Sequence, residues 1–175
     1  MHSTLCQPES QDMIPIDFKQ GMRRLTAGVS LITVDTGTAR HGLIATAVTS
    51  LCAEPPSLLI CVNQTASIHA HLADAESFCV NVLSQDQQAI AQRFATPKNR
   101  ESRFDVGEWM TLDTGAPALV GAQVSFDCKR VGLTSFGTHS VFIGEIVSLT
   151  DWQTDCDPLI WHDGKFTALP QMETA

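Results

Sequence analysis

The chain has 175 residues, of which 43% are hydrophobic and 17% are charged, as is typical of one globular domain with a packed core. Nineteen Asp and Glu residues against eleven Lys and Arg residues give a net charge of −8, which argues against general binding to nucleic acid or to an anionic membrane. No apolar stretch is long enough to span a bilayer, and the N-terminal segment lacks the basic and apolar regions of a secretory signal.

The two ends of the chain are polar. We expect residues 1–13 and 170–175 to be flexible, which leaves residues 14–169 as a single domain. Phe18, Met22 and Leu25 recur at helical spacing, with Asp17 available as a cap and Gly28 as a stop, so a short helix is expected near the start of the domain.

Strands make up most of the remainder. Alternating or β-branched runs predict strands at 29–34, 58–62, 77–83, 124–131, 140–149, 158–162 and 165–169, and residues 36–40 read as a turn. Asp163 and Gly164 join the last two strands and are a typical hairpin pair. Two short helices are expected at 67–73 and 84–94, the second with Ser84 and Gln87 in capping-box positions. Residues 95–115 lack periodicity and are expected to form a long loop.

Seven or more strands with few inserted helices predict a mainly β fold, an antiparallel barrel rather than a βαβ sheet. No Gly-x-Gly-x-x-Gly follows a strand, so a Rossmann domain is not expected. The cysteines form no Cys-x-x-Cys pair, and Cys52, Cys61 and Cys79 lie in apolar runs. We therefore expect reduced, buried thiols and a cytoplasmic location.

No metal or nucleophile motif stands out. His69 and His71 are two residues apart on an expected helix, where side chains at that spacing point in different directions and cannot share a metal ion. There is no Gly-x-Ser-x-Gly sequence, and no cysteine lies in a basic context.

Two segments are unusual in a way that suggests ligand binding. Residues 42–50 are rich in Ala, Thr and Ser, whose small side chains allow a flat ligand to approach the backbone and whose hydroxyls can hold a polyol or phosphate. The strand at 58–62 then leads through Asn63, Thr65 and Ser67 to a helix start, where free backbone N–H groups can bind an anion. The alternative is a packed strand of small residues followed by an ordinary N-cap.

A third segment places His139 directly after Gly137-Thr138 and at the start of a strand. A histidine in that position can stand at the mouth of a barrel and bond a ligand carbonyl or amide. The alternative is a histidine on the surface at a strand end.

Together these segments resemble the short-chain flavin reductase family, the small reductase components of two-component flavin monooxygenases, which includes the 4-hydroxyphenylacetate monooxygenase reductase. The resemblance covers residues 18–169 and rests on the order and spacing of several motifs: residues 42–50, Pro55-Pro56, 61–63, Ser67, 79–83, Arg103-Phe104, 124–128 and 137–139. Many members carry Gly-Asp-His where this chain has Gly137-Thr138-His139.

The resemblance implies an FMN-binding split β-barrel that works as a homodimer, with FMN or FAD at the subunit interface and NADH or NADPH as the hydride donor. It also implies that the reduced flavin is delivered to a flavin-dependent oxygenase component. Carried over to this sequence, the cofactor-binding residues lie along the flavin ring and ribityl chain (Thr46, Ala47, Val48, Thr49 and Ser50), near the phosphate (Asn63 and Ser67) or in the loop beyond (Arg103 and Phe104). His139 is the residue implied to face the nicotinamide.

The reaction predicted from this resemblance is NAD(P)H:flavin oxidoreduction. Two alternatives stay open: a flavin-dependent reductase of another acceptor such as a cobalt corrinoid, and a non-catalytic split-barrel protein that binds flavin or haem. The sequence alone does not distinguish FMN from FAD or NADH from NADPH.

Overall fold

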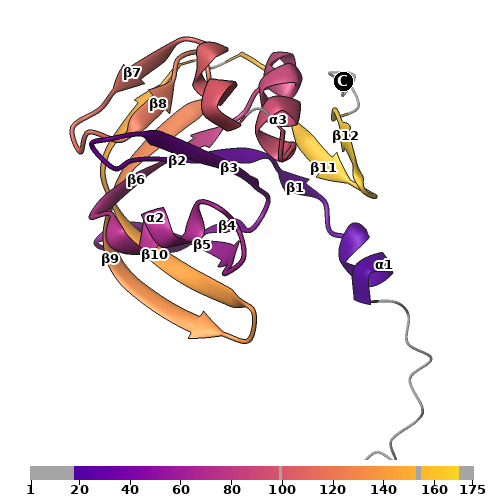
Figure 1. Cartoon of the computed structure of the whole chain (residues 1–175). Helices are drawn as coiled ribbons and strands as arrows, with labels where there is room; N and C mark the ends of the chain where they lie inside the picture. Colours follow the sequence, from indigo (N-terminus) through magenta and orange to yellow (C-terminus); the bar gives the residue numbers. More distant parts are fainter. Residues whose placement is uncertain (1–17, 99, 153–154, 170–175) are drawn as a thin grey trace, which may run out of the picture.

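A computed structural model describes residues 18–98, 100–152 and 155–169. The main feature is a seven-stranded sheet in the order β3-β2-β6-β9-β10-β5-β4, in which every pairing is antiparallel (Figure 1). Its strands are β2 (Ser30–Asp35), β3 (Arg40–Ala45), β4 (Val48–Ala53), β5 (Pro56–Asn63), β6 (Ser77–Val82), β9 (Val124–Phe136) and β10 (His139–Asp151). The predicted mainly β, antiparallel architecture is confirmed.

The two edge strands of this sheet, β3 and β4, follow one another in the sequence. The sheet therefore curls until its edges meet at the turn formed by Thr46 and Ala47, where the Cys61 N–H donates to the Ala47 carbonyl at 3.0 Å. The edges do not pair with each other, so the barrel has an open seam, as expected for a split barrel.

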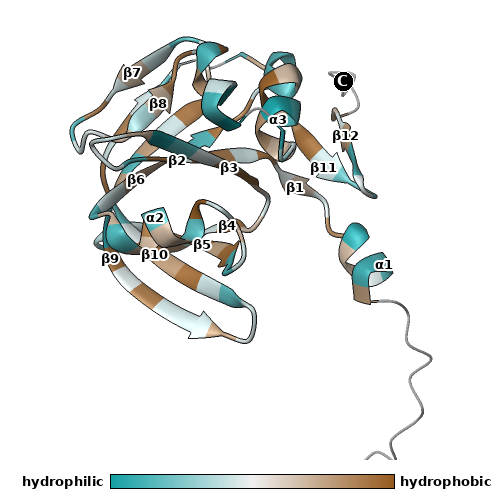
Figure 2. Ribbon diagram, in the orientation of Figure 1, coloured by the Kyte–Doolittle hydropathy of each residue, from teal (hydrophilic) through white to brown (hydrophobic). Residues whose placement is uncertain are grey.

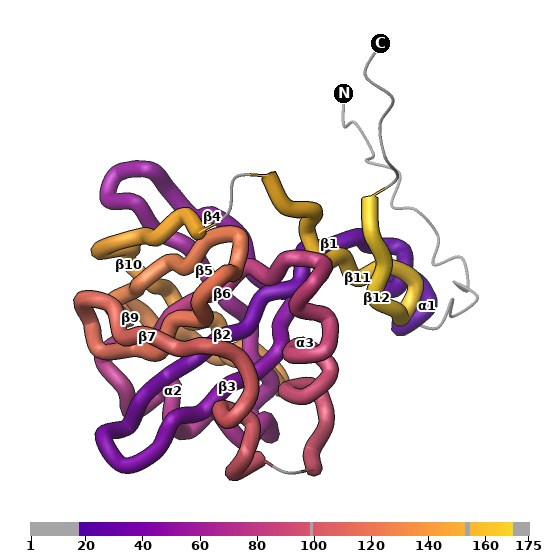
Figure 3. Tube along the Cα trace, turned by 90° about the horizontal axis from the view of Figure 1, so that it is seen from above, coloured from indigo at the N-terminus to yellow at the C-terminus, as the bar shows by residue number. Residues whose placement is uncertain are grey.

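Smaller elements surround the barrel. Strands β1 (Ala27–Gly28), β11 (Ile160–His162) and β12 (Lys165–Thr167) form a three-stranded sheet, and β7 (Trp109–Thr111) pairs with β8 (Pro117–Leu119). The helices are α1 (Phe18–Arg23), α2 (His69–Asp74) and α3 (Gln88–Ala95), with 3-10 turns η1 (Gln85–Gln87) and η2 (Arg100–Asp105). Figure 3 shows α1, β11 and β12 gathered at one side of the barrel, and the Asp163 N–H bonds the Arg23 carbonyl there.

Strand β2 separates two apolar cores, because its side chains alternate between the faces of the sheet. Ile32 and Val34 face the barrel interior, where they pack with residues such as Phe142. Leu31 faces the outer core beneath α3, where it packs with Phe94. Both faces of β2 are therefore buried. The hydropathy colouring shows apolar and polar residues interspersed along the ribbon, for example on β9 and β10 (Figure 2).

The side chain of Asn81 on β6 is a fully buried polar hub in this core. Its Nδ2 donates to the Leu31 carbonyl at 3.0 Å and to Thr33 Oγ1 at 3.2 Å. Its Oδ1 accepts from the Leu119 N–H and the Ser125 hydroxyl, both at 2.8 Å. One amide thereby joins β2, β6, β8 and β9.

The structure also corrects details of the predicted elements. The segment 95–115 is not a plain loop, because it contains η2 and β7. Strands β9 and β10 have 13 residues each and extend beyond the predicted ends at 131 and 149. The first helix ends at Arg23 rather than near Gly28. The helix-start prediction is supported, since the Ser84 N–H donates to Gln87 Oε1 at 3.2 Å. The segments predicted to be flexible, 1–13 and 170–175, lie outside the described residues.

Candidate functional site

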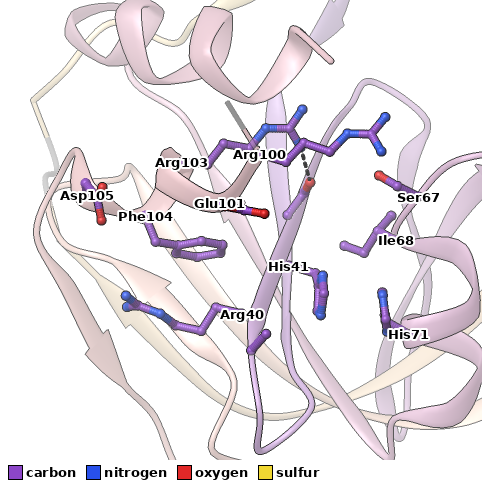
Figure 4. A pocket seen from close by; sticks show the side chains of 12 residues that line it. Arg40, His41, Ser67, Ile68, His71, Arg100, Glu101, Arg103, Phe104 and Asp105 are labelled. Carbon is purple, nitrogen blue, oxygen red and sulfur yellow. Dashed lines mark hydrogen bonds between the residues drawn. The ribbon is translucent and has the colours of Figure 1, made fainter. Parts of the chain in front are cut away.

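A groove of about 510 Å³ lies between β3, α2 and η2 (Figure 4). Three of the predicted site residues, Ser67, Arg103 and Phe104, line it together although they are up to 37 residues apart in the sequence. The curl of the sheet brings β3 next to α2, and η2 closes the groove from the other side.

Ser67 is exposed at the rim of this groove, just before α2. The N-cap of α2 is Ile68, which has no side-chain cap hydrogen bond. The alternative interpretation of Ser67 as an ordinary N-cap serine is therefore wrong. Its hydroxyl makes no hydrogen bond to any residue that the structure describes, so it is available to a ligand.

Arg103 is 7% exposed and connects the walls of the groove. One terminal nitrogen donates to the Gly42 carbonyl at 3.4 Å and the other donates to the Thr96 carbonyl. Its buried Nε has no partner within the described chain. Burial lowers the pKa of Arg103, and the neighbouring guanidinium groups of Arg100 and Arg93 lower it further. Because free arginine titrates above about 12, Arg103 still carries its charge at neutral pH.

The donors that face this groove suit a phosphate. The hydroxyl of Ser67 and the guanidinium groups of Arg100 and Arg103 line the groove and are hydrogen-bond donors, and phosphate oxygens are acceptors. Arg–phosphate bonds are charge-assisted and among the stronger hydrogen bonds in proteins. The residues present therefore fit the phosphate of a flavin nucleotide.

Phe104 forms an aromatic wall beside these donors. It is 9% exposed, and its ring packs edge-on against Phe94 and tilted against Trp109. The guanidinium carbon of Arg40 lies 4.7 Å from the centre of the Phe104 ring. Figure 4 shows this Arg40–Phe104 pair at the end of the groove away from Ser67.

Asn63 and His139 form a second group on the neighbouring strands β5 and β10, where they lie opposite each other. His139 is exposed, and its Nδ1 lies 2.9 Å from Thr138 Oγ1. The Asn63 Oδ1 already accepts hydrogen bonds from the backbone N–H and the hydroxyl of Thr65, both at 2.9 Å. Asn63 therefore shapes the turn after β5, and only its Nδ2 stays available among the described contacts.

The remaining predicted residues follow the open seam. Thr46 and Ala47 are exposed at the turn that joins the sheet edges and line a shallow hollow that also includes Trp161. On β4, Val48 packs against the inner core, whereas Thr49 and Ser50 are exposed. One chain thus carries the predicted residues in three groups on its surface rather than in one enclosed pocket.

Most of the backbone donors expected to bind an anion near Ser67 are used within the chain. The Gln64 N–H donates to the Thr138 carbonyl, the Ala66 N–H to the Asn63 carbonyl and the His69 N–H to the Ala66 carbonyl, all at 2.9 Å. The Thr65 N–H is held by Asn63, as described above. The expectation of free N–H groups is therefore wrong at these positions, and side chains supply the donors instead.

The structure adds a histidine pair that the sequence did not indicate. His41 on β3 and His71 on α2 stack with ring centres 3.6 Å apart and planes at 14°, and both line the groove. Burial lowers the pKa of His41, His71 lowers it further, and Asp35 opposes the shift. His69 lies on a different side of α2, with its Nε2 2.9 Å from Ser140 Oγ. The two helix histidines thus have separate partners, as their spacing predicted.

All five described cysteines are free. Cys79 and Cys128 are fully buried. Burial raises the pKa of both thiols, with a smaller effect from the nearby Asp127 carboxylate, and the pKa of Cys128 rises to about 12. Cys52 is exposed, which corrects the expectation that it is buried, and Cys61 is half-buried.

A protein-family model described as flavin reductase like domain matches residues 22–170, which covers the barrel and the groove. The chain belongs to this family. The reductase component of the FADH(2)-dependent resorcinol hydroxylase of Rhizobium sp. (strain MTP-10005) is 42% identical over 154 residues, which are 87% of this chain and 86% of that protein.

Other flavin reductases show the same relationship. The FMN reductase (NADH) RutF of Pantoea ananatis (strain LMG 20103) is 37% identical over 153 residues, with 87% of this chain and 80% of the relative covered. The solved structure of the NADH:FAD oxidoreductase SgcE6 of Streptomyces globisporus C-1027, in complex with NAD and FAD fragments, aligns with a TM-score of 0.84. That alignment has 27% identity and covers 98% of this chain and 100% of SgcE6.

Proposed function

We propose that this protein is an NAD(P)H-dependent flavin reductase that supplies reduced flavin to a partner oxygenase. The observation that carries this conclusion is the match of nearly the whole described chain to flavin reductases at 37% and 42% identity. The donor set of the groove agrees with it, since it suits the phosphate of a flavin nucleotide. No helix among the described residues has the length and apolar character needed to cross a membrane.

Flavin, when bound, supplies the redox chemistry by accepting a hydride from reduced nicotinamide. The chain's own residues need only bind and orient two cofactors, so no acid–base pair is required. Ser67, Arg103 and Arg100 hold the flavin phosphate. The Gly42 carbonyl accepts a hydrogen bond from Arg103, and Thr46 lies four residues further along the chain at the seam. An extended segment of that length spans about 13 Å. The seam residues Thr46 to Ser50 take the ribityl chain and ring.

The role of Ser67 is tested by Ser67→Ala. A hydrogen bond to a charged phosphate contributes about 1.5–3 kcal/mol, so FMN binding is expected to weaken about tenfold or more. Riboflavin lacks the phosphate and serves as the control ligand, whose affinity is expected to stay unchanged. Because Ser67 does not cap α2, the melting temperature is expected to stay within about 2 °C of wild type for such a surface change. Unchanged FMN affinity contradicts this role.

His139 is assigned the positioning of the nicotinamide, through a hydrogen bond to its carboxamide or a contact with its pyrophosphate. Hydride transfer requires no proton from the protein at the reacting carbon, so His139→Ala acts through orientation. The expected loss in kcat/KM for NADH is at least about tenfold, or 1.4 kcal/mol. Flavin affinity is expected to change by less than about threefold, and reduction by dithionite is expected to be unaffected.

The matched control for His139 is His162→Ala, which removes another exposed histidine, one bonded to Thr26 Oγ1 at 2.8 Å. NADH turnover is expected to survive the His162 change. If His139→Ala also leaves turnover unchanged, His139 is an ordinary surface residue at a strand end.

The active form is proposed to be a homodimer. The β9–β10 hairpin carries large apolar side chains that one chain leaves in solvent, with Val131 57%, Phe136 88% and Leu149 58% exposed. The seam residues and His139 are also open in one chain, so a second copy can complete the site. Light scattering is expected to give twice the chain mass of 19.0 kDa. A fully active monomer contradicts the proposal.

A further inference from the structure

The segments that carry Ser67 and His139 are bonded to each other. Ser67, assigned to the flavin phosphate, lies between β5 and α2 and lines the groove (Figure 4). His139, assigned to the nicotinamide, begins β10 just after the β9–β10 turn. Hydride transfer is fast only when the reacting atoms of the two cofactors are about 3–3.5 Å apart and aligned. The contacts that fix one segment against the other therefore bear on the rate of transfer.

Gln64 makes two of these contacts, both at the surface. Its backbone N–H donates to the Thr138 carbonyl at 2.9 Å, and its Nε2 donates to the His139 carbonyl at 3.5 Å. Gln64, Thr138 and His139 are all exposed. Hydrogen bonds at such positions exchange with bonds to water, so each contributes little net stability.

His69, the first residue of α2, makes a buried contact between the same two segments. Its Nε2 lies 2.9 Å from Oγ of Ser140, which directly follows His139 and is 1% exposed. The Ser140 hydroxyl also lies 2.9 Å from that of Ser135, its partner on β9. The His69 ring packs edge-on against the buried Phe142, with ring centres 5.5 Å apart. His69 is therefore held by both a polar and an apolar contact to β10.

The His69 side chain does not belong to the groove. His71, two residues later on α2, lines the groove, and side chains at that spacing point in different directions. Ser140 and His139 are neighbours on a strand, so their side chains point to opposite faces of the sheet. His139 is exposed and Ser140 is buried, as this alternation requires. His69 can therefore act on His139 only through the backbone of β10.

We propose that His69 is a positioning residue for hydride transfer, which fixes His139 relative to Ser67. The proposal rests on the proposed function, because it takes the flavin phosphate to lie at Ser67 and the nicotinamide at His139. Ser67 precedes His69 by two residues and His139 precedes Ser140 by one, so the His69–Ser140 contact gives a short connection between the two groups. Without this contact each group keeps its own donors, but their relative position is no longer fixed. Binding of each cofactor is then nearly unchanged, and transfer between them is slower.

The test is His69→Ala, in which the reduction of bound FMN by NADH is followed in a single turnover. The rate at saturating NADH is expected to fall at least about fivefold, because orientation is lost. The dissociation constant of FMN and the NADH concentration for half-maximal rate are expected to change less than about threefold. His69→Gln is expected to stay within about twofold of wild type, since the glutamine amide can replace the imidazole as the partner of Ser140.

The matched control is His162→Ala. It also removes a histidine bonded to a hydroxyl, that of Thr26 at 2.8 Å, and this contact joins neither of the two segments. The reduction rate is expected to stay unchanged in this variant. Ser140→Ala removes the His69 contact from the other side and is expected to slow reduction by the same factor as His69→Ala. The double variant is expected to be no slower than either single variant, because both changes remove one contact.

A purely structural role for His69 gives a different result. His69→Ala then lowers the melting temperature but keeps the reduction rate within about twofold of wild type, and this overturns the inference. It is also overturned if His69→Gln is as slow as His69→Ala, or if the effects of His69→Ala and Ser140→Ala multiply. If His69→Ala does not fold, the rate of Ser140→Ala decides between the same outcomes. All these results leave reduction by the wild type intact, whereas a wild type that binds flavin and does not reduce it with either nicotinamide overturns the proposed function itself.

Discussion

Replacement of Gly42 by alanine tests how the groove is built. Gly42 lies on β3, where its carbonyl accepts the hydrogen bond from Arg103. A Cβ atom at this position would lie 2.4 Å from Phe94 Cε1 and 2.7 Å from Phe94 Cδ1, with Leu31 Cδ1 at 3.3 Å. Contacts under 3.0 Å do not occur for real Cβ atoms, so the Phe94 ring must move.

The Phe94 ring has little space to move into. It is 2% exposed and packs against Phe104 and Trp109, with ring centres 5.2 and 5.9 Å away. Adding a methyl group to a close-packed core of this kind costs about 1–3 kcal/mol. In a domain of this size, 1 kcal/mol lowers the melting temperature by roughly 2–4 °C, so Gly42→Ala is expected to lower it by about 2–12 °C.

Thermal unfolding followed by circular dichroism measures this effect, with Gly28→Ala as the control. Gly28 lies on strand β1, and a Cβ atom there would meet no other atom within 4 Å. Gly28→Ala is expected to leave the melting temperature unchanged or slightly raised, because alanine reduces the entropy of the unfolded chain. A Gly42→Ala protein as stable as the Gly28→Ala protein refutes the argument that Phe94 is fixed against β3.

Three further predictions concern the buried amide of Asn81, the His41 side chain and the cysteines. Asn81→Ala leaves several buried partners unsatisfied and is expected to lower the free energy of unfolding by about 3 kcal/mol or more in urea titrations, whereas a cost below about 1 kcal/mol contradicts its role as a hub. Because the pKa of His41 is lowered on folding, the unfolded chain binds the extra proton as pH falls below about 6.5, so stability decreases towards acid. His41→Asn is expected to reduce the loss of melting temperature between about pH 7.5 and pH 5.5, and an unchanged loss refutes this. With a thiol reagent at about pH 8, Cys52 is expected to react in the folded protein and the high-pKa thiols Cys79 and Cys128 only after unfolding; rapid modification of either buried thiol contradicts their burial.

Strands could be predicted where one face or both faces of the strand are buried along its length. Strand β2 has both faces buried and appears in the sequence as a run of apolar and β-branched residues interrupted by Ser30, so it was placed within one residue. Strand β10 was predicted at 140–149 and extends only from His139 to Asp151. The outer part of β9, residues 132–136, was missed because the hairpin leaves the core there, and residues such as Thr134 and Phe136 are exposed. Without a buried face, a strand has no alternation that a sequence can display. The 3-10 turn η2 was missed for a related reason, since its buried residues Arg103 and Phe104 are adjacent rather than periodic.

The site was predictable only in part. The resemblance indicated Ser67, Arg103 and Phe104, and the structure brings these three into one groove. It gave no indication that Arg103 is a buried bridge between two carbonyls or that Asn63 is committed to its own turn. The stacking of His41 on His71 depends on the curl that places β3 beside α2, and no local spacing signals a contact between residues 30 positions apart.

The central claim is that this chain transfers reducing equivalents from a nicotinamide to flavin. Its most direct test is anaerobic mixing of the purified full-length protein and FAD or FMN with NADH and, separately, NADPH, while the visible absorbance of oxidised flavin is followed. The account predicts that the absorbance is lost with one nicotinamide oxidised per flavin, that the rate depends on the protein, and that air restores the absorbance. A protein that binds flavin but leaves it oxidised in the presence of both nicotinamides contradicts the account.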